Sequence, residues 1–510
     1  MLHYREGMNM LLNTDVIIIG GGSTGCGIAR DLALRGIPHC LIERYDFASG
    51  ATGACHGLLH SGGRYVVNDP EAAAECISEN MILRKIGEKC VEPTGGLFVR
   101  LPGDSKRYRD NFLRRCAATG IPTEVLSPSR ALDLVPNLNP SLEEAITVPD
   151  CSIDPFRLCM LNVTSSEKRG GEILTHHQII EIIKEHGRCV GVKAQEQTTG
   201  DIKEIRGKVI INAGGAWSDR IATLAGNKVR LSLSKGSLII ANHRLTNMVL
   251  NRLRPASDGD LLVPNEAVCL SGTTSLTVEN PDDLEVYPSE VDMLAREATA
   301  MVPEFGTTRL IRTYAGVRPL LSADTDDGRE ISRGFRIIDH RDGMLSIVGG
   351  KLTTYRLMAE KMTDTVMDIF GLKTQCTTAE VPLEGQEELS GYPLSKRLKD
   401  ISDIICECEL VNRHDVERVA QKVGTRHIGD IQHRTRLGMG PCQGGFCTYR
   451  ALGIMQETGK MTPQESTRIL KEFLQRRFKG IKPALWGDQL REEQLVESIY
   501  LGILAMEQEQ

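Results

Sequence analysis

The sequence predicts an α/β fold: a Rossmann-like nucleotide-binding domain with an inserted antiparallel or mixed β-sheet domain, followed by a small, mainly helical domain at the C-terminus. Three observations support this prediction. An apolar run at residues 15–19 leads directly into the glycine-rich stretch 20–25, as a buried parallel strand leads into a phosphate-binding turn. Alternating apolar runs separated by turns fill residues 226–340. Four cysteines stand in two close pairs between residues 406 and 447.

Composition excludes several classes of protein. The 510 residues suggest about three domains of roughly 150 residues each. A net charge of −6 and a pI near 6.1 give no basic surface for nucleic acid. No stretch approaches about eighteen apolar residues, so we expect no membrane span, and any membrane contact should be peripheral or through a partner. Fifteen cysteines without a secretion signal favour a reducing, cytoplasmic compartment over a disulfide framework.

The glycine-rich turn has the pattern of a dinucleotide site. Gly20 permits the tight turn, Gly22 lets the backbone approach a pyrophosphate, and Gly25 lets the following helix, predicted at residues 26–35, pack close to the strand. The amino end of that helix offers free N–H groups to the phosphates. Glu43 ends the next strand, where it can accept from ribose hydroxyls. Only one such turn is present and no second one for NAD, which favours FAD as a bound prosthetic group.

Two later segments extend the same domain. Residues 207–217 and 343–354 each read as a buried strand that ends in glycines, followed by predicted helices at 218–225 and 355–370. Glycines at the carboxyl ends of strands are where such a fold meets its ligand, although each could also be a mere packing turn. The predicted FAD-binding residues are Gly20, Gly22, Ser23, Thr24, Gly25, Glu43, Arg44, Thr52, Gly53, Ala213, Gly214, Trp217, Gly349, Gly350, Lys351, Leu352 and Thr353.

Cations in glycine-rich segments suggest an anion site beside the nucleotide. Polar, flexible segments at residues 49–53 and 60–65 follow Glu43, and further cations occur at 312–319 and 329–333. Several fixed cations around one pocket would hold a phosphate dianion, arginine as a fork and lysine as a point charge. Each arginine alone is more simply a solvated surface charge, so the interpretation depends on their lying together. Residues 226–340, with 90–150, should form a cap sheet crossed by a helix at 284–302.

Cys406, Cys408, Cys442 and Cys447 form two tight pairs in a polar, glycine-rich context. Structural zinc sites favour gaps of two to four residues in both pairs. A [2Fe–2S] cluster needs two sulfurs on each iron and accepts other spacings, so it is the favoured interpretation. Zinc and reduced, buried thiols are the alternatives. A cluster here would make the protein a carrier of single electrons.

The tail contains further helices. Residues 415–423 and 428–435 read as helices, and Thr462 and Pro463 open another, whose apolar positions have the spacing of a core face. The predicted division is nucleotide-binding segments at residues 14–90, 151–225 and 341–372, cap segments at 91–150 and 226–340, a linker at 373–400, a [2Fe–2S] domain at 401–460 and a helical tail at 461–510.

Four motifs, at residues 16–25, 60–65, 314–319 and 349–356, resemble the flavin subunits of the anaerobic, respiratory branch of the FAD-dependent glycerol-3-phosphate dehydrogenase family. The four cysteines resemble those of the bacterioferritin-associated-ferredoxin type of [2Fe–2S] domain. One position departs from the family pattern. Aerobic single-chain members carry a Ser-Lys pair shortly before the histidine that matches His60, whereas this chain has His56-Gly57, so the resemblance assigns no contact to this loop.

The resemblance implies oxidation of sn-glycerol 3-phosphate to dihydroxyacetone phosphate, with hydride passing to FAD. Electrons would then reach a (mena)quinone through iron–sulfur centres and partner subunits, which would hold the chain peripherally on the cytoplasmic face of a prokaryotic inner membrane. Whether an FMN also binds at a partner interface stays open. The resemblance implies substrate-binding roles for Arg64, Tyr65, Arg318, Arg333, Lys351, Thr353 and Thr354, and catalytic roles for His60, Arg318 and Lys351.

His60 is the candidate base for the hydroxyl proton, because an imidazole titrates near neutral pH, although a structural histidine is an equal alternative. Two other functions are compatible with the same fold. One is a flavin oxidoreductase of another 2-hydroxy acid or amino acid, and the other is a non-catalytic, redox-sensing flavoprotein. The cations separate the first of these from the leading hypothesis, because a carboxylate substrate needs one fork rather than four cations.

Overall fold

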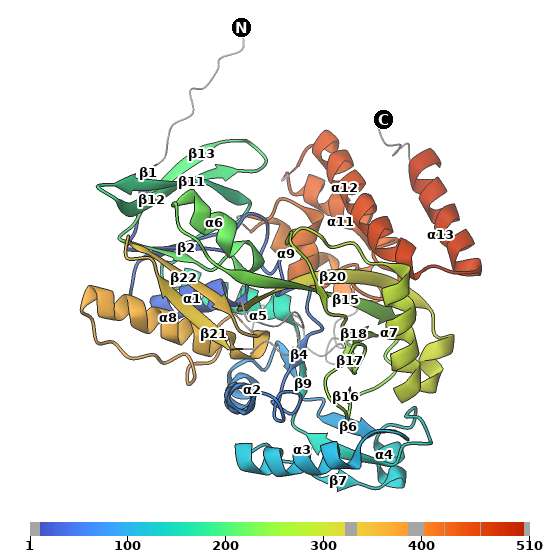
Figure 1. Cartoon of the computed structure of the whole chain (residues 1–510). Helices are drawn as coiled ribbons and strands as arrows, with labels where there is room; N and C mark the ends of the chain where they lie inside the picture. Colours follow the sequence, from blue (N-terminus) through green and yellow to red (C-terminus); the bar gives the residue numbers. More distant parts are fainter. Residues whose placement is uncertain (1–10, 322–333, 386–401, 423, 460, 504–510) are drawn as a thin grey trace.

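The computed structural model describes residues 11–321, 334–385, 402–422, 424–459 and 461–503. The chain has three parts (Figure 1). A layered α/β part carries the predicted nucleotide turn, a large second sheet lies beside it, and a helical C-terminal part packs against both. The cap prediction that residues 90–150 join the second sheet agrees with its strand order.

A six-stranded sheet forms the centre of the nucleotide-binding part. Its order is β10-β3-β2-β14-β22-β21, with every pair parallel except the last, β21 with β22. The strands are β2 (Val16–Ile19), β3 (His39–Ile42), β10 (Glu172–Leu174), β14 (Val209–Asn212), β21 (Phe335–Asp339) and β22 (Met344–Gly349). The four apolar residues of β2 are all buried, as expected for a strand covered on both faces.

Different layers cover the two faces of this sheet. Val16 and Ile18 pack against the helices α1 (Ser23–Leu34), α5 (Pro155–Glu167) and α8 (Tyr355–Phe370). The alternate residues Ile17 and Ile19 face a second, four-stranded sheet. That sheet consists of β1 (Leu11–Asn13), β13 (Ile202–Arg206), β12 (Arg188–Glu196) and β11 (His177–Glu185). The sequence did not predict this separate sheet.

The large second sheet is built from segments far apart in the sequence. Its order is β19-β15-β18-β17-β16-β6-β8-β7, and β20 pairs with β15. Its strands are β6 (Gly96–Arg100), β7 (Val125–Leu126), β8 (Glu144–Val148), β15 (Leu231–Ala241), β16 (Val249–Arg252), β17 (Leu261–Asn265), β18 (Val268–Gly272), β19 (Leu276–Thr277) and β20 (Leu310–Leu321). Helix α7 (Pro288–Met301) shares a buried core with this sheet, close to the predicted helix at 284–302.

Shorter elements join the two sheets. One is a three-stranded sheet with the order β4-β9-β5. In the sequence, its short strands come between strands of the two larger sheets. These elements are β4 (Leu58–Leu59), β5 (Val91–Glu92), β9 (Cys151–Ile153), α2 (Pro70–Ile86), α3 (Lys106–Thr119), α4 (Pro128–Leu134), α6 (Ser218–Leu224) and the 3₁₀ turn η3 (Leu352–Thr354).

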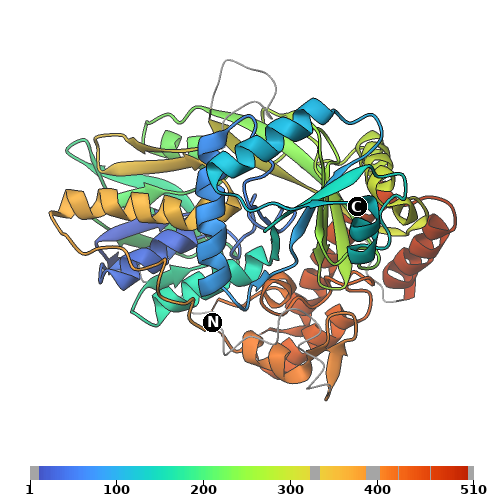
Figure 2. The same cartoon turned by 90° about the horizontal axis from the view of Figure 1, so that it is seen from below.

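The C-terminal part has one hydrophobic core of its own. It contains β23 (Ile404–Cys406), β24 (Val411–Asn412), α9 (Arg413–Ala420), α10 (Ile428–Thr435), α11 (Cys447–Glu457), α12 (Pro463–Ile481) and α13 (Asp488–Ser498). Ile469 and Phe473 of α12 are buried in the same core as Cys406 and Cys447. The expected helical tail after residue 460 is therefore packed into the cysteine domain rather than separate from it. Figure 2 shows this part beneath the rest of the molecule.

Several expected boundaries shift for physical reasons. Helix α1 begins at Ser23, because Gly22 is its N-cap, three residues before the predicted start. Strand β21 extends the six-stranded sheet to Phe335, across the expected cap boundary at residue 340. The described part of the expected linker packs on the nucleotide domain, where Arg30 donates to the carbonyl of Val381 at 2.6 Å. Among the described helices, none has the length and apolar character that crossing a bilayer requires.

Candidate functional site

A cavity of about 750 Å³ lies at the carboxyl ends of β2, β3, β14 and β22. Its wall continues onto the large second sheet, so both main parts of the chain line it. The carboxyl edge of an open parallel sheet is where this fold binds ligands. Most of the predicted FAD-binding residues line this cavity: Gly20, Gly22, Ser23, Thr24, Glu43, Arg44, Thr52, Ala213, Gly214, Trp217, Gly349, Gly350, Lys351 and Leu352.

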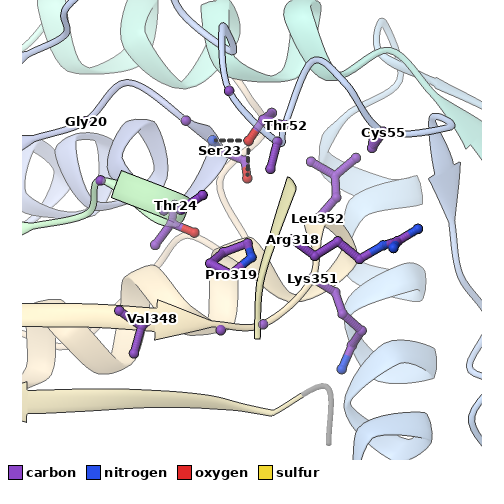
Figure 3. A pocket seen from close by; sticks show the side chains of 18 of the residues that line it. Gly20, Ser23, Thr24, Thr52, Cys55, Arg318, Pro319, Val348, Lys351 and Leu352 are labelled. Carbon is purple, nitrogen blue, oxygen red and sulfur yellow. Dashed lines mark hydrogen bonds between the residues drawn. The ribbon is translucent and has the colours of Figure 1, made fainter. Parts of the chain in front are cut away.

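The glycine-rich turn leaves no room for side chains. Gly20 has a φ of +115°, and a Cβ on Gly25 would lie 1.9 Å from the carbonyl oxygen of Gly20. Gly25 is therefore behind the cavity wall, where it lets α1 approach β2. Ser23 N–H, in the first turn of α1, donates to Thr52 Oγ1 at 3.1 Å (Figure 3). This bond joins the loop after β3 to the amino end of α1, where a pyrophosphate is expected.

Glu43 closes the same corner from the end of β3. Its carboxylate accepts from Gly21 N–H at 2.6 Å and from Tyr45 N–H at 2.9 Å. Burial raises the pKa of Glu43. Glu43 therefore lies beside the glycine turn, and its contact with the ribose stays a prediction. Gly53 is different, because it packs against Ala48 and Phe156 and supports the loop from behind.

Three of the four predicted cations reach the cavity wall: Arg64, Arg318 and Lys351. The Arg318 guanidinium donates to Ser234 Oγ and to the carbonyl oxygen of Thr274, each at 3.2 Å, which fixes it on the second sheet. Figure 3 shows Arg318 and Lys351 on the side of the cavity away from Ser23 and Thr52. The fourth cation, Arg333, lies outside the described residues.

The Arg64 and Lys351 side chains have carboxylate neighbours. Arg64 Nη2 lies 3.3 Å from Asp260 Oδ2, and Lys351 Nζ lies 4.0 Å from Glu75 Oε2. Lys351 Nζ is also 5.4 Å from the centre of the Tyr65 ring. The cavity therefore has a cationic end, held in place by side chains from both main parts of the chain.

His60 is buried, with 6 % of its surface exposed, and it also lines the cavity. Its backbone N–H donates to Thr353 Oγ1 at 3.1 Å, and its Nε2 lies 3.4 Å from the Tyr65 hydroxyl. His56 lines the cavity too, with its ring centre 5.5 Å from that of His60.

The structure does not bring Thr353 and Thr354 to the cavity wall, so their expected contacts with substrate are wrong. Both are fully buried in η3, because this tight turn points their hydroxyls back into the protein. Thr353 holds His60, and Thr354 Oγ1 donates to the carbonyl oxygen of Lys351 at 3.3 Å. They support the residues that reach the cavity.

Sequence reasoning missed part of the wall. His177 and Gln178 of β11 and Thr273 beside Arg318 line the cavity. The first two come from the unpredicted four-stranded sheet, so no local pattern connected them to the nucleotide turn. An expected glycine-rich turn at residues 312–319 is instead the middle of the long strand β20.

The four cysteines meet in the C-terminal domain. Cys442 hydrogen-bonds with both Cys408 and Cys447, and Cys406 hydrogen-bonds with Cys447. These contacts lower the pKa of Cys406 and of Cys442 and raise that of Cys408 and of Cys447. A Cβ on Gly440 would lie 2.5 Å from the Cys408 side chain, so only glycine fits beside it. Among the described residues, no group of three or more His, Cys, Asp or Glu side chains has the geometry for a single metal ion.

Comparisons with known proteins decide the family. The model of the FAD dependent oxidoreductase family matches residues 15–356, and that of the BFD-like [2Fe-2S] binding domain matches residues 404–457. One subunit of the anaerobic glycerol-3-phosphate dehydrogenase of Escherichia coli (strain K12) is 42 % identical, over 98 % of each chain. The chain belongs to this family of FAD-dependent oxidoreductases.

Other relatives from the anaerobic glycerol-3-phosphate dehydrogenases agree. The matching subunit of the Haloferax volcanii enzyme is 40 % identical over 97 % of this chain and 91 % of its own. The solved glycerol-3-phosphate dehydrogenase of Bacillus halodurans, complexed with FAD, has the same fold, with a TM-score of 0.66 at 23 % identity over 93 % of this chain and 96 % of its own. The predicted fold, the family resemblance and the cofactors FAD and [2Fe–2S] are therefore confirmed.

Proposed function

We propose that this chain is the flavin subunit of a respiratory dehydrogenase that oxidises sn-glycerol 3-phosphate to dihydroxyacetone phosphate. One observation carries the proposal: the dinucleotide turn and three cations, Arg64, Arg318 and Lys351, line a single cavity. Figure 3 shows Arg318 and Lys351 on the side away from the turn. Relatives that match nearly the whole chain are named for this activity.

The cationic end suits a phosphate better than a carboxylate. Arg64 and Arg318 offer guanidinium forks and Lys351 a point charge, and none of these groups can accept a hydrogen bond. A phosphate dianion presents several acceptor oxygens, each strengthened by its charge. A 2-hydroxy acid or amino acid would use one fork and would not engage the other two cations. We therefore place the phosphate beside these three residues.

His60 is the residue we assign as base for the hydroxyl proton. FAD, when bound, takes the hydride from the carbinol carbon. The hydrogen bond from His60 N–H to Thr353 fixes the backbone of the histidine, and Tyr65 fixes its ring from the Nε2 side. Lys351, close to the Tyr65 ring, stabilises negative charge on the substrate oxygen as the proton leaves.

The cysteine domain gives the electrons an exit. Cys406, Cys408, Cys442 and Cys447 would hold the [2Fe–2S] cluster, with two thiolates on each iron. From there, single electrons pass to partner subunits and a (mena)quinone, and these subunits hold the chain peripherally on the cytoplasmic face of the inner membrane. The relatives are themselves named as single subunits of a larger enzyme, which supports the existence of such partners.

Anaerobic titration tests the proposal. We expect sn-glycerol 3-phosphate to bleach the flavin absorption of the FAD-loaded protein. Glycerol, which lacks the phosphate, and a 2-hydroxy acid such as lactate should leave it unchanged at the same concentration. Bleaching by lactate but not by the phosphate ester would favour the alternative oxidoreductase, and an unchanged spectrum with every compound would favour a redox sensor.

The base role of His60 predicts the effect of one substitution. His60→Asn should slow flavin reduction by about 10²- to 10⁴-fold, the usual contribution of a general base, while FAD stays bound. Stopped-flow absorbance under argon measures this rate. The same substitution at the exposed His186 is the matched control and should leave the rate unchanged. A near-normal rate in the His60 variant would exclude the residue as the base.

A further inference from the structure

We propose that His56 is a further substrate-binding residue, which donates a hydrogen bond from its Nε2–H to the phosphate of the substrate. This inference rests on the function proposed above and deepens it. It concerns a loop to which the family resemblance assigned no contact.

The backbone fixes the tautomer of His56. Its Nδ1 accepts a hydrogen bond from the Leu58 N–H at 3.2 Å. A backbone N–H can only donate, so Nδ1 carries a lone pair and the proton of the neutral ring is on Nε2. Gly57 makes this geometry available, because its φ of +65° forms the turn and a Cβ there would lie 2.8 Å from the carbonyl oxygen of Ile153.

The other ring nitrogen is available to a ligand. His56 lines the cavity. Within the described part of the chain, Nε2 has no hydrogen-bond partner, since the ring's one polar contact is that with Leu58. The ring therefore presents a donor of fixed direction at the cavity wall. Its companion His60 differs, because its Nε2 already contacts the Tyr65 hydroxyl.

The ring stays neutral in the cationic end of the cavity. Burial, together with the positive charges of Arg318 and Arg64, lowers the pKa of His56 to about 3. The two arginines that act on it are those assigned above to the phosphate. A neutral donor at this point adds a hydrogen bond to the dianion without adding a further positive charge beside the two arginines.

The two histidines therefore have different tasks. Their rings meet edge to face, at an interplanar angle of 82°. His56 is fixed as a donor and binds the acceptor oxygens of the phosphate, whereas His60 takes up a proton from the hydroxyl group. Each of the four side chains assigned to the phosphate is then a donor, which matches a dianion that has only acceptor atoms.

Two substitutions separate the donor from its support. His56→Asn keeps an oxygen that can accept from the N–H two residues on, as Asn does in turns, but it has no donor at the position of Nε2. His56→Gln reaches that position with an amide N–H. Both variants are prepared with FAD bound. Calorimetry measures the affinity for inorganic phosphate, and stopped-flow absorbance gives the half-saturating concentration and limiting rate with sn-glycerol 3-phosphate.

We expect the Asn variant to bind phosphate about 10- to 100-fold more weakly, the loss typical of a hydrogen bond to a charged group. The half-saturating concentration should rise by the same factor, while the limiting rate of flavin reduction stays within about threefold of normal. The Gln variant should recover most of the affinity. If the Asn variant does not retain FAD, the phosphate affinity of the Gln variant alone tests the inference.

Three results would overturn the inference. They are unchanged phosphate affinity in the Asn variant, an equal loss in both variants, and a lower limiting rate at unchanged affinity. The second would mean that His56 only shapes its loop, and the third that it acts on the reacting oxygen. If the unsubstituted protein binds phosphate through His56 but is not reduced by sn-glycerol 3-phosphate, the proposed reaction fails and this site stands.

Discussion

Arg436 joins the cysteine domain to the rest of the chain through a buried ion-pair network. Its guanidinium donates to Glu409 Oε2 at 3.0 Å, to Asp154 Oδ2 at 2.9 Å and to Asn265 Oδ1 at 2.8 Å. Glu409 directly follows Cys408, one of the four proposed cluster ligands, and Asp154 is the N-cap of α5. Replacing Arg436 with Met therefore tests how firmly the two parts are joined.

The expected loss follows from the burial of the carboxylates. Asp154 and Glu409 are both 0 % exposed, and Arg436 is 4 % exposed. Removing one partner of a buried pair costs about 3–5 kcal/mol, because a charge is left in a medium of low polarity. Arg436→Met removes the partner of two carboxylates, which could double this loss. We expect a single loss in this range, because Arg157 also lies 3.8 Å from Asp154 and still compensates its charge. Burial alone would raise the pKa of Asp154, and Arg436 and Arg157 together lower it.

Urea unfolding of the protein loaded with both cofactors measures the change, with far-ultraviolet circular dichroism and cluster absorbance as signals. The matched control combines Arg436→Met with Glu409→Gln and Asp154→Asn. This neutral set has no buried charge left to compensate, and Asn caps a helix about as well as Asp, so most of the lost free energy should return. A loss below about 1 kcal/mol in the single variant, or no recovery in the triple variant, refutes the reasoning.

Four other substitutions test separate features. Gly25→Ala should abolish FAD retention, measured as flavin content, because its Cβ would overlap the Gly20 carbonyl. Gly453→Ala, with open space around it inside α11, should stabilise the domain by about 0.5–1 kcal/mol, measured by urea unfolding. Burial would lower the pKa of His176, but Asp430 at 3.1 Å raises it. That stabilisation is complete below about pH 6.5 and is lost as the pH rises through the raised value, and His176→Gln should remove this pH dependence of the unfolding free energy. Cys442→Ser should remove the cluster absorbance and leave the FAD content unchanged, and an intact cluster would contradict the ligand set.

Sequence patterns correctly predicted the elements whose conformation depends mainly on residues close by in the sequence. The helix predicted at 355–370 has those bounds in the structure, because Gly371 adopts the left-handed conformation that ends it. The glycine turn at 20–25 was also predicted correctly, because its spacing is a local pattern, although of its glycines only Gly25 has its close contact, with Gly20, inside the turn itself. The cations were recognisable as residue types, and three of them do line the cavity.

The sequence could not reveal which residues meet across long distances. Nothing local connects Arg436 with Asp154, 282 residues earlier in the chain. Thr353 and Thr354 are only two and three residues after Lys351, yet a single tight turn puts their hydroxyls inside the protein and the lysine at the cavity. Tyr500 is likewise buried, and its hydroxyl donates to the carbonyl oxygen of Gly445, 55 residues earlier in the chain.

Strand β20 is a further case in which residues close in the sequence lie in different places, and it also limits how the cysteine domain can move. Arg312 and Arg318 were predicted as one set of cations, but six residues of strand separate them by about 20 Å. Arg318 lines the cavity, whereas Arg312 Nη1 lies 3.5 Å from Gln443 Oε1, next to the cluster ligand Cys442. Burial and the charges of Arg477 and Arg476 lower the pKa of Arg312 to about 10.

The same strand holds the cavity and the cysteine domain at a fixed separation. Thr313 Oγ1 donates to the Gly480 carbonyl of α12 at 2.9 Å, and the Tyr314 hydroxyl donates to the Cys55 carbonyl at 3.0 Å, directly before His56. Because β20 pairs with β15 along its whole length, its contacts with the cysteine domain and with the loop before His56 stay at a fixed distance from each other. The cysteine domain is thus held against β20, the strand that brings Arg318 to the cavity wall, and this contact fixes its position. We therefore expect electrons to leave the flavin for the cluster at a rate that does not depend on solvent viscosity.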